Sequence, residues 1–314
     1  MMLVVVIPAY NEEKTIGNVI KDIPRKLFDN IKILVIDDGS TDNTVKEAKK
    51  SGADKIVSFD DNKGLANAFR VGLDTALDMG ADIIVNIDAD HQYYSEEIPD
   101  LIQPIIDGKA DIVLGSRFKG QIEYMPKRKR LGNILATRIT GFLIGSSISD
   151  AQTGFRALSR EAALRQNILS DYTYTQEMII QSVHKGLRLI EVPCKFRARR
   201  AGESRLITGI FEYARRGGLT ILRTYRDYSP LRTFLLIGGI LSLIGLVVGL
   251  RVLVHFFLTG AVSPYIPSAI LTVVLLIVGF QIMILGLIGD MVTSNRRLLE
   301  EIIYRLKSEK RARA

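Results

Sequence analysis

The sequence predicts an α/β domain with a mostly parallel sheet, followed by a hairpin of two membrane-spanning helices. Short apolar runs alternate with amphipathic segments over the first 114 residues. This alternation has the spacing of right-handed strand–helix–strand units, which indicates the parallel sheet. The hairpin is predicted because residues 233–250 and 268–289 carry no charged side chain, and crossing the hydrocarbon core takes about 20 apolar residues.

The apolar runs of the first part have the composition of buried parallel strands, which are apolar on both faces. Pro8 ends the first run, and Asp37 and Asp38 follow the second. The predicted strands are residues 3–7, 31–36, 55–58, 83–87 and 112–114. Helices are expected between them, because several intervening segments begin with cap residues and end at Gly or Pro. The predicted helices are residues 15–23, 41–50, 64–79 and 95–106.

Polar residues collect where these strands end. Asp88 and Asp90 directly follow the fourth strand, and two carboxylates this close repel each other unless a cation lies between them. Hard divalent ions are commonly held by one or two carboxylates together with substrate phosphates. Similar loops follow the first three strands, with Tyr10 and Glu12, Asp37 and Asp38, and Asn62 and Gly64. Because open α/β sheets bind ligands at this edge, the sequence indicates a metal–diphosphate site there.

Each of these loops also has a purely structural interpretation. The Asp-x-Asp pair could be a polar turn, the Asp38 loop a helix cap, and Glu12 a first-turn acid favoured by the helix dipole. The sequence contains neither a Gly-x-Gly-x-x-Gly after the first strand nor a P-loop. A bound nucleotide would therefore be held without a dinucleotide fingerprint or a Walker loop, and a metal would carry much of the diphosphate charge.

The charge of the chain is unevenly distributed. Residues 1–100 contain 11 Lys and Arg against 19 Asp and Glu, whereas residues 101–314 contain 31 against 15. The basic part is expected to meet anions or an anionic membrane surface, and its apolar last third favours membrane over nucleic acid. The single cysteine, Cys194, excludes an internal disulfide and a cysteine-based metal cluster. The first residues lack the basic region of a signal peptide.

Five motifs, in this order, resemble the family 2 inverting glycosyltransferases, which have the Rossmann-like GT-A fold. They are VIPAYNE at 6–12, IDDGSTD at 36–42, NKGL at 62–65, DADHQ at 88–92 and GSRF at 115–118. The resemblance implies a nucleotide-sugar donor and a Mg²⁺ or Mn²⁺ ion held by Asp88, Asp90 and Gln92. The implied donor-binding residues are Pro8, Ala9, Tyr10, Asn11, Glu12, Ile36, Asp38, Asn62, Gly64, Asp88, Ala89, Asp90, Arg199 and Arg205.

Within this family, residues 3–206 resemble the dolichyl-phosphate mannose synthases and polyprenyl-phosphate glycosyltransferases. The matching motifs are Arg117, RLGN at 130–133, the run 150–156, QEM at 176–178 and GESR at 202–205. The resemblance implies that the lipid phosphate is bound by Arg117, Arg130, Asn133 and Ser204. It also implies a loop, with Arg199, Ser204 and Arg205, that closes on donor and acceptor. The implied catalytic residues are Asp90, Arg117, Arg130 and Glu177, of which Glu177 would orient the acceptor.

The implied reaction transfers a sugar to dolichyl or polyprenyl phosphate with inversion. GDP-mannose is the favoured donor, but UDP-glucose and UDP-N-acetylglucosamine stay open, because the mannose synthases usually have lysine where Arg205 stands and differ around Asp150. A processive polysaccharide synthase is disfavoured, since that group carries a Gln-x-x-Arg-Trp signature and this chain has no tryptophan. The alternative from another class is a non-catalytic, membrane-anchored sugar-nucleotide sensor or scaffold.

A basic run at 126–130 precedes a second candidate membrane contact. Behind it, the apolar residues recur at helical spacing, at Ile134, Leu135, Ile139, Phe142 and Leu143. This pattern indicates a helix on the membrane surface. The alternative is a solvated charge run before an ordinary core helix.

The expected domain organisation has four parts. They are a GT-A domain at 1–206, an amphipathic interface helix at 207–230, two transmembrane helices at 231–290 and a basic amphipathic tail at 291–314. Both flanks of the hairpin are basic, so the positive-inside rule predicts that the catalytic domain and both termini are cytoplasmic. The hairpin could also join copies of the chain into a homo-oligomer.

Overall fold

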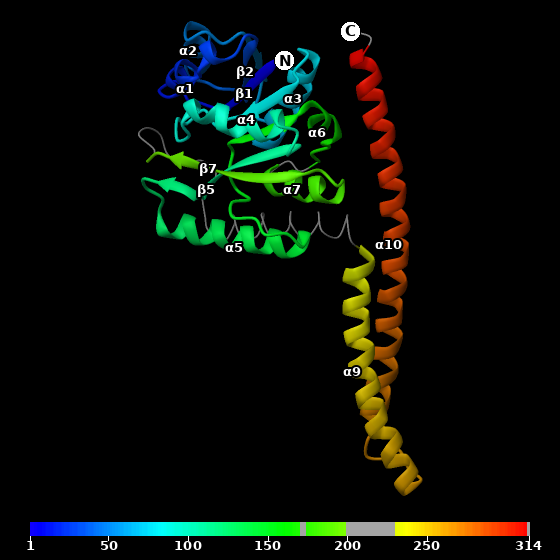
Figure 1. Ribbon diagram of the computed structural model, residues 1–314. Helices are drawn as coiled ribbons and strands as arrows, with labels where there is room; N and C mark the ends of the chain where they lie inside the picture. Colours follow the sequence, from blue (N-terminus) through cyan, green and yellow to red (C-terminus); the bar gives the residue numbers. More distant parts are fainter. Residues whose placement is uncertain (170–173, 199–229, 313–314) are drawn as a thin grey trace. The chain divides into compact units, whose positions relative to one another are not determined.

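A computed structural model of the chain describes residues 1–169, 174–198 and 230–312 (Figure 1). The chain divides into two units. The first consists of Met1–Leu222 together with Ile303–Ala314, and the second of Arg223–Ile302. The predicted interface helix at 207–230 lies, except for its last residue, outside the described residues. The predicted domain boundaries therefore stay predictions.

A seven-stranded sheet forms the centre of the first unit. Its strands are β1 (Leu3–Ala9), β2 (Ile31–Asp37), β3 (Lys55–Ser58), β4 (Ile83–Asn86), β5 (Ile112–Ile122), β6 (Arg156–Ser159) and β7 (Leu189–Phe196), in the order β3-β2-β1-β4-β6-β5-β7. β6 is antiparallel to β4 and β5, and the other neighbouring strands pair in parallel. The predicted α/β class with a mostly parallel sheet is confirmed.

Helices cover both faces of this sheet. They are α1 (Ile16–Asp22), α2 (Thr44–Lys50), α3 (Leu65–Asp78), α4 (Ile98–Ile106), α5 (Lys127–Ile144), α6 (Arg160–Arg165) and α7 (Thr175–His184), with short 3-10 turns at Arg25–Leu27 and Ser95–Glu97. Alternate residues of β1 belong to two core clusters. One cluster includes side chains of α1, α2 and α4, and the other includes side chains of α3, α6 and α7. Because both faces are covered, all seven residues of β1 are buried, which explains its continuous apolar sequence.

The register brings the ends of the parallel strands to one edge. Ala9 at the end of β1 lies beside Asp37 at the end of β2, and Asp37 lies beside Ser58 at the end of β3. Asn86 ends β4 and pairs with Arg156 of β6, which in turn pairs with β5. The loops that follow β1, β2, β3 and β4 therefore share an edge of the sheet.

Helix α5 has its polar side inward and its apolar side outward. Its buried side chains are Asn133, Thr137 and Thr140. Its exposed apolar side chains are Leu131 (69%), Leu135 (58%), Ile139 (42%) and Phe142 (86%). Helix α5 contacts α7, and Figure 1 shows it along one side of the first unit. A core helix would bury such a stripe, so the structure does not match the alternative of an ordinary core helix.

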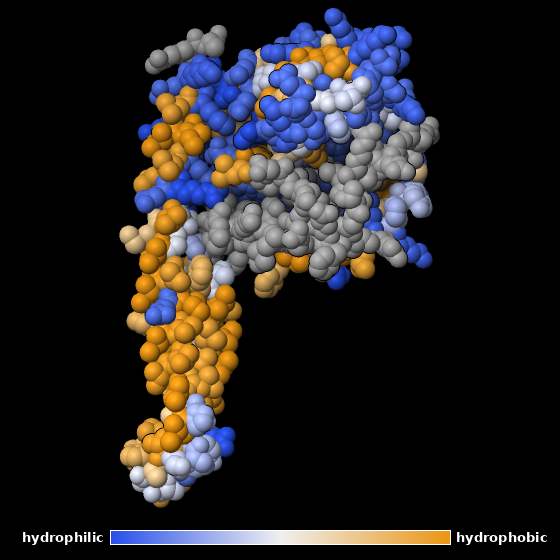
Figure 2. All heavy atoms as spheres, turned by 180° about the vertical axis from the view of Figure 1, so that it is seen from behind, coloured by the Kyte–Doolittle hydropathy of each residue, from blue (hydrophilic) through white to orange (hydrophobic). Residues whose placement is uncertain are grey.

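The second unit contains two long apolar helices, α9 (Pro230–Thr259) and most of α10 (Ile266–Ala312). Both are long and apolar enough to cross a membrane, and only 11% of the most apolar window of each is buried. Figure 2 shows a largely hydrophobic surface along them. The helices approach closely at small residues. A Cβ atom on Gly238 would lie 2.5 Å from the Gly279 carbonyl oxygen, and small residues allow close packing of this kind between membrane helices.

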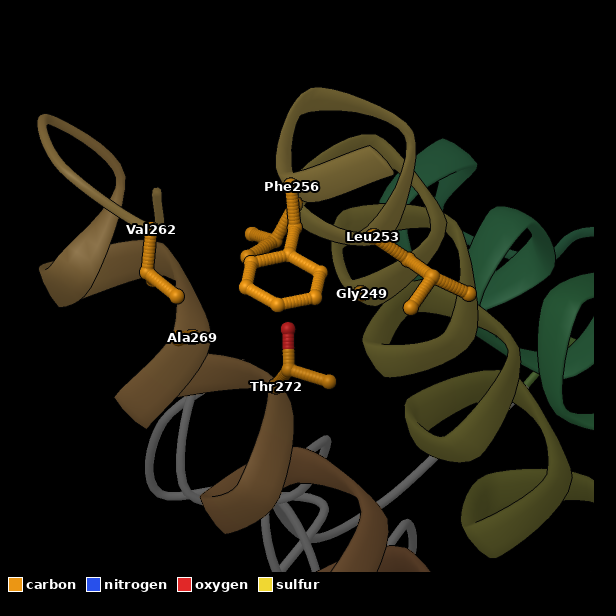
Figure 3. Close-up of a pocket in the computed structure, with 7 residues that line it drawn as sticks. Gly249, Leu253, Phe256, Val262, Ala269 and Thr272 are labelled. Carbon is orange, nitrogen blue, oxygen red and sulfur yellow. The ribbon is translucent and has the colours of Figure 1, made fainter. Parts of the chain in front are cut away.

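A cavity of about 310 Å³ lies between α9, α10 and the loop that joins them (Figure 3). It is lined by Gly249, Val252, Leu253, Phe256, Val262, Ala269 and Thr272. In Figure 3 the hydroxyl of Thr272 points toward the ring of Phe256. The lining has no ionisable side chain, so the cavity does not offer the charges that a diphosphate requires.

The last turns of α10 belong to the first unit and pack against α3 and α6. The Tyr304 hydroxyl donates a hydrogen bond of 2.9 Å to Glu161. Arg311 forms ion pairs with Asp78 at 2.7 Å and with Asp74 at 3.2 Å. Part of the basic face predicted for the tail therefore contacts acidic side chains of the first unit.

Candidate functional site

The loops after β1 and β2 are joined by hydrogen bonds. The backbone N–H of Asn11 donates to the Ser40 hydroxyl (2.9 Å), and the Thr41 N–H donates to the Asn11 side-chain oxygen (2.7 Å). The Glu12 N–H donates to the Thr44 hydroxyl (2.8 Å). Asn11 has a φ of 52°, a conformation that Asn tolerates better than most residues. The predicted donor loop, which follows the buried Pro8 and Ala9, is thus held in one conformation.

Asp38 supports the loop that follows β3. Its carboxylate accepts hydrogen bonds from the backbone N–H groups of Lys63 (2.7 Å) and Gly64 (3.0 Å). Burial raises the pKa of Asp38, although these two hydrogen bonds act against that rise. The structure therefore brings the predicted donor residues Asp38, Asn62 and Gly64 together. Ile36, another predicted donor residue, is fully buried in the core, so neither its side chain nor its backbone is accessible to a ligand in this structure.

Asp88 and Asp90 follow β4 at the same edge. Burial, together with the charge of Asp90, raises the pKa of Asp88 above its usual range. The Gln92 N–H donates to Asp90 Oδ1 at 3.1 Å, so the three predicted metal ligands form one short loop. In the described parts of the chain, no three His, Cys, Asp or Glu residues are grouped to hold an ion. Two repelling carboxylates and an amide oxygen nevertheless fit Mg²⁺ or Mn²⁺ when a diphosphate supplies further oxygen ligands.

Gly154 packs directly against the carboxylate of Asp88. A Cβ atom at Gly154 would lie 2.3 Å from each carboxylate oxygen of Asp88. The Gly154 N–H donates to the Tyr93 hydroxyl (3.0 Å), and its carbonyl accepts from the Asn86 side chain (2.7 Å). Both supporting side chains are buried. The position of the Asp88 carboxylate is therefore set by a buried network and not by the loop alone.

Arg156 organises the segment 150–156 from inside the protein. It is fully buried, and its guanidinium donates to the carbonyl oxygens of Thr153 (2.7 Å), Thr175 (2.8 Å) and Ala151 (2.9 Å). It also lies 5.4 Å from the ring centroid of Tyr174. A buried cation with several carbonyl acceptors fixes the surrounding backbone, which here includes Gly154.

Arg117, the predicted ligand of the lipid phosphate, is held by Asp150. Its Nε lies 2.6 Å and its Nη2 2.8 Å from the two carboxylate oxygens, and its guanidinium lies 5.2 Å from the ring centroid of Phe196. Arg117 is only 4% exposed, and Asp150 is fully buried. This two-point contact fixes the plane of the guanidinium and leaves Nη1 as its remaining nitrogen.

The other predicted acceptor residues are placed differently. Arg130 is exposed on α5, whereas Asn133 is buried on the inner side of the same helix. Glu177 is buried in α7, where Oε1 accepts hydrogen bonds from the Leu169 N–H and the Gln181 side chain, both at 3.0 Å. The predicted closing-loop residues Arg199, Ser204 and Arg205 lie outside the described residues. The roles of all these residues stay predictions.

Sequence reasoning did not identify the residues that support the site. Tyr93, Asn86 and Asp150 contact their partners across separations of 33 to 68 positions. Motifs that are interpreted one at a time do not indicate contacts between residues so far apart in the sequence. The one available signal was the run 150–156, which the family resemblance singled out without giving its members a role.

Comparison with known proteins identifies the family. Residues 4–165 match the glycosyl transferase family 2. The chain is 36% identical over 218 residues to the UDP-N-acetylglucosamine–dolichyl-phosphate N-acetylglucosaminyltransferase of Methanococcus voltae, covering 62% of this chain and 85% of that protein. It is 36% identical over 210 residues to the dolichyl-phosphate hexose transferase of Haloferax volcanii, covering 65% and 86%.

A solved structure supports the fold assignment. It is the glucosyl-3-phosphoglycerate synthase of Mycobacterium tuberculosis in complex with Mn²⁺, uridine diphosphate and phosphoglyceric acid, with a TM-score of 0.56 and 24% identity over 71% of this chain and 78% of that one. The likeness confirms the predicted GT-A fold. The sequence matches show that the chain belongs to glycosyl transferase family 2 and is a sugar-transferring enzyme.

Proposed function

We propose that this enzyme transfers a sugar from a nucleotide diphosphate sugar to dolichyl or polyprenyl phosphate, with inversion at the anomeric carbon. One observation carries this proposal. Asp88, two residues before Asp90, lies close enough to the fixed guanidinium of Arg117 for the charges of Asp88 and Arg117 to interact. One side of the site suits a metal and a diphosphate, and the other suits an acceptor phosphate. The names of the two dolichyl-phosphate relatives support this acceptor.

Asp88, Asp90 and Gln92 would hold Mg²⁺ or Mn²⁺ against the diphosphate. The raised pKa of Asp88 reflects unfavourable negative charge, which a bound cation would relieve. When bound, the ion supplies positive charge that stabilises the departing diphosphate. The loops that Asn11 and Asp38 stabilise through hydrogen bonds would bind the base and ribose of the donor.

The acceptor phosphate would act as the nucleophile. A phosphate monoester is largely ionised at neutral pH, so the reaction does not require a strong general base. A phosphate oxygen forms a bond to the anomeric carbon while the bond from that carbon to the diphosphate breaks, and in-line displacement inverts the centre. Arg117, oriented by Asp150, would bind the acceptor phosphate with Arg130, Asn133 and Ser204. For Glu177 we propose only that it orients the acceptor.

The exposed stripe on α5 supports a location at the membrane surface. Its four apolar side chains face outward, and the basic residues Lys127 and Arg130 lie at the start of the same helix. Apolar side chains beside cations suit the boundary between acyl chains and anionic head groups. We propose that α5 contacts the cytoplasmic leaflet, that α9 and α10 anchor the chain in the bilayer, and that both termini are cytoplasmic. We also propose that copies of the chain associate through this hairpin into a homo-oligomer.

A donor panel tests the reaction. Membranes containing the enzyme would be incubated with polyprenyl phosphate and labelled GDP-mannose, UDP-glucose or UDP-N-acetylglucosamine. We expect one donor to give a lipid-linked product, and our predicted donor is GDP-mannose. Because the M. voltae relative is named for UDP-N-acetylglucosamine, a product from that donor alone would replace mannose in the proposal. No lipid-linked product with any of these donors would overturn the proposed polyprenyl-phosphate acceptor.

Asp90→Asn tests the metal site directly. Loss of one of the two carboxylates should lower transfer by at least about a hundredfold, because interactions that stabilise transition-state charge contribute on this scale, while the thermal unfolding temperature stays near that of the wild type. Removal of divalent ions with a chelator should have the same effect. The matched control is Asp29→Asn, an exposed acid outside the site. Full activity in the presence of the chelator would refute the metal role.

A further inference from the structure

His91 lies in the middle of the predicted metal loop but has no role in the function proposed above. Its φ is 59°, in the left-handed region that few residues other than Gly adopt, although Asn, Asp and His do so more often than the rest. Such a conformation persists when surrounding contacts hold it. The contacts of His91 therefore indicate what fixes the loop.

Two charged residues hold the imidazole of His91. Its Nε2 lies 2.7 Å from Oδ2 of Asp22 and 2.6 Å from Nη1 of Arg197, and its Nδ1 lies 3.3 Å from the same Nη1. Nε2 donates to Asp22 in one tautomer and accepts from Arg197 in the other. Arg197 and Asp22 also form an ion pair of 3.5 Å. The side chains of Arg197 and His91 are 12% and 15% exposed, so solvent screens this cluster only in part. Asp22 ends α1, and Arg197 directly follows β7.

Arg197 also holds the next residue of the loop, Gln92. The Arg197 N–H donates to the Gln92 carbonyl (2.8 Å), and the Gln92 side-chain nitrogen donates to the Arg197 carbonyl (3.2 Å). Because the nitrogen end of the Gln92 amide is used in this way, the oxygen end is the one turned away from Arg197. That oxygen is the atom with which Gln92 would bind a cation.

We propose that Asp22 and Arg197 are positioning residues that hold His91 and Gln92, and thereby the loop from Asp88 to Gln92, in the conformation that binds the divalent ion. This inference rests on the metal site of the proposed function. Neither side chain is expected to touch the ion. The two side chains act through the imidazole. The hydrogen bonds to Gln92 come from the backbone of Arg197, so they remain in Arg197→Met and that variant tests the contact with His91 alone.

Binding of Mn²⁺ in the presence of GDP and, separately, of UDP tests the proposal, with electron paramagnetic resonance as the readout. We expect Arg197→Met and Asp22→Ala to weaken Mn²⁺ binding by about ten- to a hundredfold, the usual effect of losing a residue that orients a metal ligand. The matched control is Arg188→Met, because Arg188 pairs at the surface with Asp111. This control should bind Mn²⁺ like the wild type.

His91 supplies a second, independent comparison. His91→Gly removes the imidazole but allows the left-handed backbone, whereas His91→Ala removes it and disfavours that backbone. Mn²⁺ should therefore bind more weakly to His91→Ala than to His91→Gly. Wild-type Mn²⁺ affinity in Arg197→Met, Asp22→Ala and His91→Ala, with only their unfolding temperatures lowered, would overturn the positioning role. Absence of Mn²⁺ binding by the wild type itself would overturn the metal site and this inference together.

Discussion

Gly154 determines where the Asp88 carboxylate lies. The nearest neighbours of a Cβ atom at this position would be the two oxygens and the Cγ of Asp88, all within 2.5 Å. Tyr93 and Asn86 fix the Gly154 backbone through hydrogen bonds, so the backbone is not free to retreat. The Asp88 side chain would have to move instead.

Gly154→Ala should therefore impair catalysis more than folding. A displacement of about 1 Å at a reacting centre can cost about a hundredfold in rate, and we expect a loss of transfer of that order. The measurements are the initial rate with the identified donor and the thermal unfolding temperature. Gly239→Ala is the control, because a Cβ atom there meets open space. A Gly154→Ala enzyme with wild-type activity would show that the carboxylate position is not critical.

Cys194 offers a second prediction at this scale. The thiol is 2% exposed in β7, and burial raises its pKa from 9.0 to about 12. Since the thiolate is the reactive form, the folded enzyme at pH 8 should react with iodoacetamide about a thousandfold more slowly than the unfolded chain. The label can be counted by mass spectrometry, because the chain has one cysteine. Rapid labelling of the folded protein would contradict the burial.

At the scale of elements, α5 shows what a periodic pattern predicts and what it leaves open. The spacing of Leu135, Ile139 and Phe142 predicted an amphipathic helix, and the helix is present. The pattern could not tell which side faces inward, because an apolar stripe serves a protein core and a membrane equally well. The polar inner side, with Asn133, Thr137 and Thr140, becomes evident only from the packing.

Leu135→Glu tests the membrane contact of α5. Moving this side chain out of lipid and adding a charge should raise the KM for polyprenyl phosphate about tenfold, since burial of one leucine contributes roughly 1.5–3 kcal/mol, and leave kcat nearly unchanged. Ile106→Glu is the matched control, because Ile106 is 47% exposed at the end of α4. Equal effects of both substitutions on KM would argue against a specific role for α5.

The length and composition of each strand explain which strands could be predicted from the sequence. β1 and β2 are long apolar runs, and their burial on both faces makes them easy to recognise. β6 has four residues and begins with the charged Arg156, while β7 contains Glu191, Pro193 and Lys195. β6 is too short to show a pattern. β7 does alternate, with Ile190, Val192, Cys194 and Phe196 on one face, but the proline and the two charged residues between them made it look like a loop, so neither strand was predicted. The antiparallel pairing of β6 in the middle of the sheet depends on long-range packing that local sequence does not encode.

For the whole molecule, the contact of the C-terminal segment with the catalytic unit leads to a prediction. Arg311 pairs with Asp78, and its side chain is 8% exposed. Arg311→Asp should lower the stability of the catalytic unit by up to about 1 kcal/mol, the usual scale for a pair near the surface. The double variant with Asp78→Arg should restore part of the loss. Chemical denaturation of the four proteins of this double-mutant cycle measures the coupling.

No coupling between the two positions would indicate that the ion pair does not contribute to stability. The ion pair between Lys307 and Asp74 and the Tyr304 hydrogen bond to Glu161 would then be the next polar contacts of this segment to examine.

The outward apolar face of α5 also has a consequence for protein production. A fragment that stops before α9 would lose both long apolar helices but keep Leu131, Leu135, Ile139 and Phe142 at its surface. Contiguous exposed apolar surface of this kind promotes aggregation in water. Deleting the hairpin should therefore not yield a detergent-free catalytic domain, whereas replacing these four side chains with polar ones in the same fragment should.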